Sequence, residues 1–280
     1  NYNALQVRLQ KRMSYGLNFL VNYAYSKSLD TGTGNGHGSG VDVYQNAYSP
    51  AANYGLSDFN ATHIFTGQIV YELPFGRGRQ YDLHGVMNQI AGGWRVSSVF
   101  QWHTGVPFTP VVQGALAQSI DTGLDSSLGN GSTLYPDLIS SPSVSNKSIH
   151  GWFNPAAYTV PCTQYYNYVD EAEECVAGTQ HFGDAGRNAL IGPRYSDVDF
   201  SISKMFSLPW EGMNLEFRAD MFNVFNHVNY ANPDANVGND CTGGTAVAAC
   251  TFSLADSTVG TITGPEGGQR VIQLGVHFRF

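Results

Sequence analysis

Seven segments of the chain alternate between apolar and polar residues, and this pattern limits the possible folds more than any other feature. In residues 270–280 (RVIQLGVHFRF), every second side chain from Ile272 to Phe280 is apolar and lies on one face. A period of two is typical of a β-strand with one apolar face. No helical period of comparable length occurs, so the sequence predicts an all-β fold. The other six segments are residues 5–10, 17–26, 65–73, 94–103, 197–206 and 214–221.

The connections between these segments alternate between short and long. Successive connections in an antiparallel up-and-down sheet lie at opposite ends, so we expect all the long loops at one end. Transmembrane β-barrels have this asymmetry, with short periplasmic turns and long extracellular loops. A soluble sandwich has no reason to sort its loops in this way. The short connections are residues 13–16, 74–93 and 207–212, and the long ones are residues 28–62, 105–194 and 227–269.

Strand length and the polar faces also fit a membrane barrel. About ten residues at roughly 3.3 Å each, tilted by about 40°, span about 25 Å, which is the height of the apolar band of such a barrel. We therefore expect the apolar faces to contact lipid and the polar faces to line a wet lumen. The charged residues on the polar faces are Arg8, Glu72, Arg95, Asp197, Asp199, Glu216, Arg218, Asp220 and Arg279.

Aromatic residues mark the two expected membrane interfaces. Trp94 and Trp102 lie on one face near the two ends of a strand, where barrels carry aromatic girdles; the alternative is that both are core residues of a soluble sheet. Open edges in lipid leave backbone groups unsatisfied, so a barrel must close. We expect the last strand, with Phe278 and Phe280, to be the closing edge that the assembly machinery reads, and Phe280 to lie at the periplasmic interface.

Composition agrees with this class and excludes others. Charged residues are 13% of the chain, about half the usual share, and the formal net charge is −8, whereas a nucleic-acid partner would require a basic surface. No run of about 18 apolar residues predicts a membrane-spanning helix. The chain begins inside a strand without a signal peptide, and seven strands is an odd number where bacterial barrels use even ones. We therefore expect a part of a larger barrel.

Four cysteines form two close pairs outside the alternating segments. Cys162 is near Cys175, and Cys241 is near Cys250. Neither spacing resembles a zinc motif, so the pairs predict local disulfides formed in an oxidising compartment. Four free thiols are the alternative.

The segment between the first two cysteines holds the candidate ligand-facing residues. QYYNY contributes Tyr165, Tyr166 and Tyr168, and DEAEE contributes Asp170 and Glu171. Tyrosines exposed at a loop tip suit ligand recognition, and acidic residues suit a cationic ligand or a divalent ion. A loop that packs on its neighbours and a solvated acidic loop are the alternatives.

No segment carries a motif for catalysis or for a cofactor. GTGNGHGSG, residues 32–40, lacks both the following helix and the lysine of a phosphate-binding loop, which predicts a flexible surface loop. A calcium site from Asp30 and Asp42 is a weak alternative. The histidines show no metal-binding spacing, and no G-x-S-x-G motif occurs. We expect no cofactor and no metal site.

Glu216, Arg218 and Asp220 alternate along one strand face and could form an acid/base set. The favoured interpretation is a charge ladder in the lumen, with Asp197 and Asp199 across the strand pair. We therefore expect that the protein is not an enzyme.

The terminal strand and four other stretches carry a family likeness: residues 58–79 (DFNATHIFTGQIVYELPFGRGR), 92–109, 183–206 and 215–233. Together they resemble the C-terminal barrel of Oar-like TonB-dependent outer-membrane receptors. The likeness covers most of the chain in the right order, while the long loops carry little of it. It implies that residues 1–280 are the C-terminal portion of a barrel of about 22 strands, preceded by a plug domain and a short TonB-contacting segment.

The resemblance implies a receptor in the outer membrane of a Gram-negative bacterium. It would bind a solute through extracellular loops, with residues 105–194 giving the largest share of the surface, and import it with energy coupling. Its partners would be outer-membrane lipid, the barrel assembly machinery through the C-terminal strand, the TonB complex through the N-terminal region, and an extracellular solute. Two alternatives remain: a passive pore or structural surface barrel, and a secreted β-sandwich that binds carbohydrate.

Overall fold

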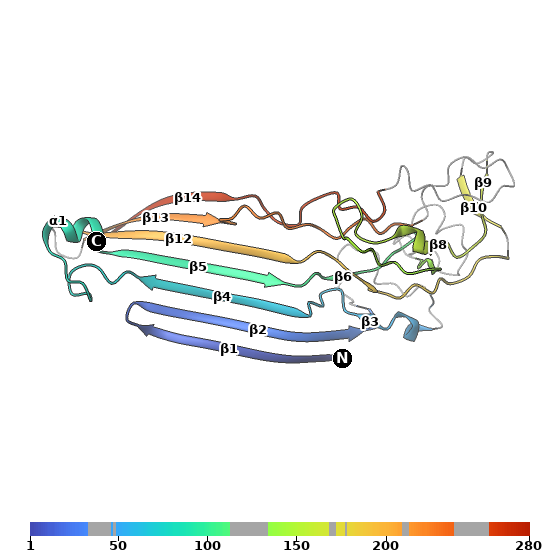
Figure 1. The fold of residues 1–280 in the computed structure, drawn as a ribbon, viewed down its shortest axis with the longest axis horizontal. Helices are drawn as coiled ribbons and strands as arrows, with labels where there is room; N and C mark the ends of the chain where they lie inside the picture. The colour runs from blue at the N-terminus through green and yellow to red at the C-terminus, as the bar shows by residue number, and fades with distance from the viewer. Residues whose placement is uncertain are drawn as a thin grey trace.

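The fold is one long antiparallel sheet with the long loops gathered at one end (Figure 1). A computed structural model of the chain describes residues 1–32, 46, 49–112, 134–167, 172–176, 178–208, 213–237 and 258–280. The order of the long strands is β1-β2-β4-β5-β12-β13-β14, and the two-residue strand β3 (Gly55–Leu56) pairs with β2. The long strands are β1 (Tyr2–Ser14), β2 (Leu17–Asp30), β4 (His63–Glu72), β5 (Trp94–His103), β12 (Tyr195–Ser207), β13 (Asn214–Phe222) and β14 (Val271–Arg279).

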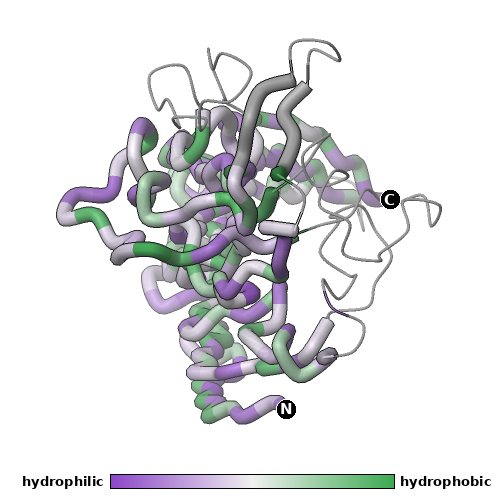
Figure 2. The backbone as a smooth tube through the Cα atoms, turned by 90° about the vertical axis from the view of Figure 1, so that its right-hand side faces the viewer, coloured by the Kyte–Doolittle hydropathy of each residue, from purple (hydrophilic) through white to green (hydrophobic). Residues whose placement is uncertain are grey.

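All seven predicted strands are confirmed, and so is the sorting of their connections. The short connections and the C-terminus lie at one end of the sheet, here called the turn end, and the long connections lie at the other, the loop end (Figure 1). Hydrophobic and hydrophilic positions alternate along the tube near the N-terminus (Figure 2). β14 ends at Arg279, so Phe280 lies one residue beyond the strand.

The residues of the turn between β1 and β2 explain why the chain reverses direction there. Tyr15 has φ 52° and Gly16 has φ 79°, the pair of positive values that a two-residue hairpin turn requires. Gly16 also lies against the neighbouring strand, because a Cβ atom there would come within 2.4 Å of the Glu72 carbonyl oxygen. The Glu72 N–H donates to the Gly16 carbonyl oxygen at 2.8 Å. Only glycine combines this backbone conformation with this approach.

Strand register brings the apolar positions onto one continuous face. The side chains on this face are exposed or half-buried, with Leu274 at 78% exposed, and an uncovered patch across seven strands is larger than soluble monomers normally carry. No second sheet covers it in the described part of the chain. One row across the sheet runs Leu17, Tyr71, Val96, Ile202, Ala219 and Leu274.

Charges on the apolar face occur only near the strand ends. They are all lysines: Lys27 at the loop end, and Lys11 and Lys204 at the turn end. Lysines at membrane interfaces extend their ammonium groups toward water along an apolar surface, whereas Lys204 is buried. The sequence pattern did not reveal Lys204, which lies on the apolar face between Ile202 and Phe206. The uncharged central band is what contact with hydrocarbon requires.

Hollows in the sheet surface lie mainly against the polar face. One of about 510 Å³ includes Gln6, Arg8 and Asn22 in its lining, and one of about 180 Å³ includes Asp199 and Arg218. A curved sheet surrounds space on its concave side. We therefore infer that the polar face is concave and the apolar face convex, as the predicted barrel requires.

The sheet is not closed. β1 and β14 each have one neighbour in the sheet, and no strand in the described part of the chain pairs with their outer edges. The expectation that these strands belong to a larger barrel stays a prediction.

Several short elements were not predicted. α1 (Gly85–Ala91) lies in the connection between β4 and β5, and seven residues are too few to give a recognisable period. No helix in the described ranges is long and apolar enough to cross a membrane. The other short elements are η1 (Pro50–Asn53), η3 (Pro155–Ala157), β6 (Pro107–Phe108), β7 (Asp137–Leu138), β8 (Tyr158–Thr159), β9 (Gln164–Asn167), β10 (Ala172–Cys175) and β11 (Leu190–Ile191).

Two adjacent serines in the middle of β5 test which face meets lipid. Ser98 lies on the apolar face and Ser97 on the polar face. Ser98→Arg should destabilise the barrel by about 2–4 kcal/mol, because a charge at the bilayer midplane is costly. Ser97→Arg should change stability by less than about 1 kcal/mol, because its side chain enters water. Chemical unfolding in lipid vesicles measures both, and equal losses would contradict the assignment of the faces.

Candidate functional site

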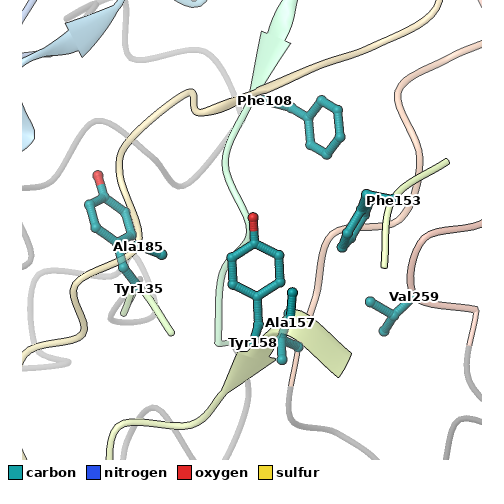
Figure 3. Packing of buried hydrophobic residues seen from close by; sticks show 8 residues of the cluster. Phe108, Tyr135, Phe153, Ala157, Tyr158, Ala185 and Val259 are labelled. Atoms are coloured by element: carbon teal, nitrogen blue, oxygen red, sulfur yellow. The ribbon is translucent and has the colours of Figure 1, made fainter. Parts of the chain in front are cut away.

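The long loops pack into a folded unit with its own hydrophobic core. Every buried hydrophobic side chain in the described residues lies in these loops rather than in the seven long strands. The main cluster joins residues of the connections 105–194 and 227–269, and Figure 3 shows most of it. We call this unit the loop body. The cluster contains Phe108, Tyr135, Phe153, Ala157, Tyr158, Ala185, Val237 and Val259.

Aromatic packing gives this cluster its shape. The Phe153 ring lies 6.0 Å from Phe108 and meets Tyr158 edge-on at 5.9 Å between centroids. Burial raises the pKa of both Tyr135 and Tyr158 to about 12, so both hydroxyls stay neutral at physiological pH. Aromatic pairs such as Phe108–Phe153 and Phe153–Tyr158 contribute about 0.5–1.5 kcal/mol each to stability, beyond the contribution of the buried area.

A buried arginine joins the first long loop to the second. The Arg187 side chain is 0% exposed and donates from Nη1 to Asp30 Oδ1 at 2.6 Å and from Nη2 to Asp58 Oδ1 at 3.0 Å. Asp30 precedes Arg187 by 157 residues. Burying a guanidinium is tolerable only when charge partners satisfy it. We call Arg187, Asp30 and Asp58 the loop clamp.

Asn188 extends the loop clamp. Its φ is 53°, a conformation that asparagine tolerates better than most residues. The side-chain amide donates to the Leu56 carbonyl oxygen at 2.7 Å and also to the Asp58 carboxylate. Its backbone N–H donates to Thr109 Oγ1 at 2.8 Å. The clamp therefore fixes three segments that lie far apart in sequence.

The first long loop folds over the polar face of β2. Ser26 and Ser28 on that face are buried. The Ser26 hydroxyl donates to the Ala61 carbonyl oxygen at 3.0 Å, and the Ser28 N–H donates to Asn60 Oδ1 at 2.8 Å. This part of the loop body thus lies on the inner side of the sheet.

The polar face carries ion pairs toward the turn end. Glu72 accepts from Arg79 and Arg95 at 2.8 Å each, and Glu216 pairs with Arg279 at 3.1 Å. Each carboxylate in this group therefore has a guanidinium partner from a neighbouring strand or turn.

The predicted ladder of Glu216, Arg218 and Asp220 lies on the polar face, but its partners differ from the prediction. Arg218 pairs with Asp220 along the same strand at 2.7 Å, and Asp220 lies opposite Ser201. Asp199 instead accepts from the Asn223 backbone N–H at 3.0 Å. Pairing of β12 with β13 begins at Phe200, so Asp197 and Asp199 lie before the paired residues.

The family model described as outer membrane beta barrel domain matches residues 1–273. The chain belongs to this family. It lies in the outer membrane of a Gram-negative bacterium, so the apolar face contacts lipid and the polar face lines the lumen. Comparisons with curated proteins and with solved structures give no match.

The ligand-facing residues predicted for this β-barrel domain lie partly in a hairpin. Tyr165 and Tyr166 belong to β9, which pairs with β10, so these two tyrosines lie in a strand of this hairpin. Tyr168, Asp170 and Glu171 lie outside the described residues. Their role in ligand contact stays a prediction.

The cysteines of the β-barrel domain are also placed only in part. Cys162 packs beside the small cluster of Val112, Leu134 and Val160 and is disulfide-bonded. Cys175 is the last residue of β10, which corrects the expectation that no cysteine lies in a strand. Because the Cys175 side chain lies outside what the structure describes, the predicted pairing stays a prediction. Cys241 and Cys250 also lie outside the described residues.

The aromatic residues of the predicted girdles lie near the ends of their strands. Trp94 and Trp102 share the lipid-facing side at opposite ends of β5. Phe278 pairs with Leu215 on that side, and its ring lies 6.1 Å from Phe280 at the turn end. Their roles as girdle and assembly signal stay predictions.

A calcium site at Asp30 has no support in this arrangement, because its carboxylate already accepts from Arg187. Asp42 lies outside the described residues. Among the described side chains, no group of three histidine, cysteine or carboxylate residues could hold a metal ion.

Loss of the clamp should loosen the loop body without unfolding the barrel. Arg187→Met should lower the free energy of local opening by about 2–3 kcal/mol, somewhat below the cost for a fully buried pair, because Asp30 and Asp58 are partly exposed. Amide hydrogen exchange around residues 56–58 and 187–189 measures this loss. Arg194→Met, at an exposed arginine of the same segment, is the control, and an equal effect there would contradict the clamp.

An exposed ion pair should make the loop body slightly sensitive to pH. Hydrogen bonding to the Thr179 carbonyl oxygen, followed by that to Asp137 at 2.7 Å, raises the pKa of His181 above 6.5. The pair therefore stabilises the fold below the unfolded pKa and is lost as pH rises through the folded one. Hydrogen exchange near Asp137 should be faster at about pH 9 than at about pH 5, beyond the intrinsic rate change.

Substitution of the histidine separates this effect from others. His181→Gln should remove the excess pH dependence, whereas His84→Gln, at a histidine paired with Asp82 at the turn end, should leave it unchanged. If the excess pH dependence of hydrogen exchange persists in the His181→Gln variant, a group other than His181 causes it.

Proposed function

We propose that this β-barrel domain is the C-terminal part of a TonB-dependent receptor that binds a solute at the loop body and imports it with energy coupling. The observation that carries this proposal is the packed loop body held over the polar face by the loop clamp. A preorganised surface at the outer mouth suits tight binding, because little order has to be created when the solute binds. A barrel that only admits solutes by diffusion does not need one.

The stretches that resemble Oar-like receptors support the same proposal. Two of them meet at the loop clamp, since Asp58 begins one and Arg187 and Asn188 lie in another. The likeness therefore includes residues that join the loops to the barrel wall.

The solute-binding surface that we propose lies on the connection 105–194. This connection supplies most of the main cluster and carries the β9–β10 hairpin with Tyr165 and Tyr166.

The unpaired outer edges of β1 and β14 support the proposal that the complete receptor has further strands. Unpaired backbone groups in lipid cost several kcal/mol each, so we propose that upstream strands close the barrel. The plug and TonB contact would belong to that upstream region, and the terminal strand β14 would meet the assembly machinery. We also propose that the paired charges of the lumen wall are structural and not catalytic.

A passive pore or structural surface barrel is the second candidate. The hollows along the polar face favour it, because a pore needs a wet lumen. A sandwich would need a second sheet packed on the apolar face, and the described strands supply none.

Dependence on energy separates the two candidates. Uptake of the solute by cells that carry the receptor should fall to the background of receptor-free cells when TonB is deleted, while surface binding remains. Uptake that continues at the same rate without TonB would establish the passive pore instead.

Substitution of the hairpin tyrosines tests the binding surface. Tyr165→Ala combined with Tyr166→Ala should weaken solute binding by about tenfold or more, since interface tyrosines often contribute 1–2 kcal/mol each. Binding to whole cells measures this. Tyr15→Ala, at an exposed tyrosine of the turn end, is the control, and unchanged binding in the double variant would place the site elsewhere.

A further inference from the structure

The helix α1 at the turn end has an apolar side that nothing in the described structure covers. Val86, Met87 and Ile90 are 73%, 58% and 63% exposed. At 100° per residue these three side chains fall within an arc of about 100°, and Gln89 lies about 160° around the helix from Met87. Such a surface is costly in water, so α1 needs a partner.

The C-terminal end of α1 is bound by side chains of the lipid-facing surface. The Trp94 Nε1–H donates to the Ile90 carbonyl oxygen at 3.0 Å, and the Lys204 ammonium donates to the Gly92 carbonyl oxygen. Both side chains extend from the apolar face of the sheet. These contacts attach α1 to the outer side of the barrel wall and not to the lumen side.

Aromatic rings hold the lysine in place. The Lys204 ammonium lies 5.1 Å from the centroid of Trp94 and 4.9 Å from that of Phe206. A cation over aromatic faces is stabilised even when it is shielded from water. Tryptophan and lysine are also the residues that fix a membrane protein at the interface.

The polar side of α1 is occupied by the turn itself. Asn88 Oδ1 accepts from the Arg77 backbone N–H at 2.9 Å. The Gly92 N–H donates to the Asn88 carbonyl oxygen at 2.9 Å. The apolar side is therefore left facing away from the turn.

We propose that α1 lies in the inner leaflet of the outer membrane, with Val86, Met87 and Ile90 among the upper acyl chains. The partner is the phospholipid bilayer. The uncovered side of α1 continues the lipid-facing surface of β5 and β12 through Trp94 and Lys204, and short amphipathic helices bind the interface in this way. The helix anchors the turn end at a fixed depth.

Spin labels on the two sides of α1 test this proposal. Met87→Cys and Gln89→Cys are labelled in the intact protein, which is reconstituted into vesicles of phosphatidylethanolamine and phosphatidylglycerol. Protein with no introduced cysteine gives the background. The ratio of collisions with oxygen to collisions with a water-soluble nickel chelate should be several-fold higher at residue 87 than at residue 89. Equal access of the nickel chelate to both would place α1 in water, and protection of residue 87 from both reagents would indicate a protein partner; either would overturn the proposal.

Variants of Lys204 test its link to the helix. Lys204→Met should shift the label at residue 87 toward water, and Lys204→Arg should keep it in the bilayer, because arginine retains the charge and the donor. Heat-modifiable migration on gels confirms that each variant is folded. If the label stays equally deep in a folded Lys204→Met variant, the anchoring role of Lys204 is wrong.

Discussion

Hydrocarbon offers no hydrogen bonds to a backbone, and this constraint accounts for the architecture of the barrel wall. Every amide in the bilayer must be paired by a neighbouring strand, and the long strands pair in unbroken registers over most of their length. Once pairing is fixed, side chains alternate between lipid and lumen. The lipid side then lacks charge in its central band, while the lumen side carries the ion pairs of Glu72 and Glu216.

The same constraint explains why the hydrophobic core lies in the loops. The bilayer covers the apolar side of the strands, so the wall needs no second layer. The loops stand in water and must bury their own apolar side chains, which they do around Phe153 and Tyr158. The loop clamp at Arg187 then fixes this unit to the barrel wall through Asp30. A packed loop body over the polar face at the loop end is the feature on which the proposed receptor function depends.

The sequence was sufficient to predict the strands of the barrel wall. A strand with lipid on one side and water on the other alternates between apolar and polar residues, and this pattern can be seen in the sequence. It was insufficient where contacts join distant segments. The sequence alone does not distinguish Arg187 from other arginines in the loops. Its partners Asp30 and Asp58 become its neighbours only in the folded chain. Lys204 interrupts an apolar face in a way that only the neighbouring Trp94 ring and the end of α1 explain. The seven residues of α1 gave no period, and the core of the loops follows no repeat that a sequence pattern could reveal.

The central claim is that the convex face of this sheet meets lipid and the concave face meets water. A cryo-electron microscopy structure of the intact protein in a lipid nanodisc tests it most directly. The account predicts that Phe100, Phe200 and Phe217 lie against the lipid of the disc, with Arg218 and Asp220 in the aqueous interior. Those three rings packed inward against a second protein layer, with Arg218 and Asp220 on the outside, would contradict it.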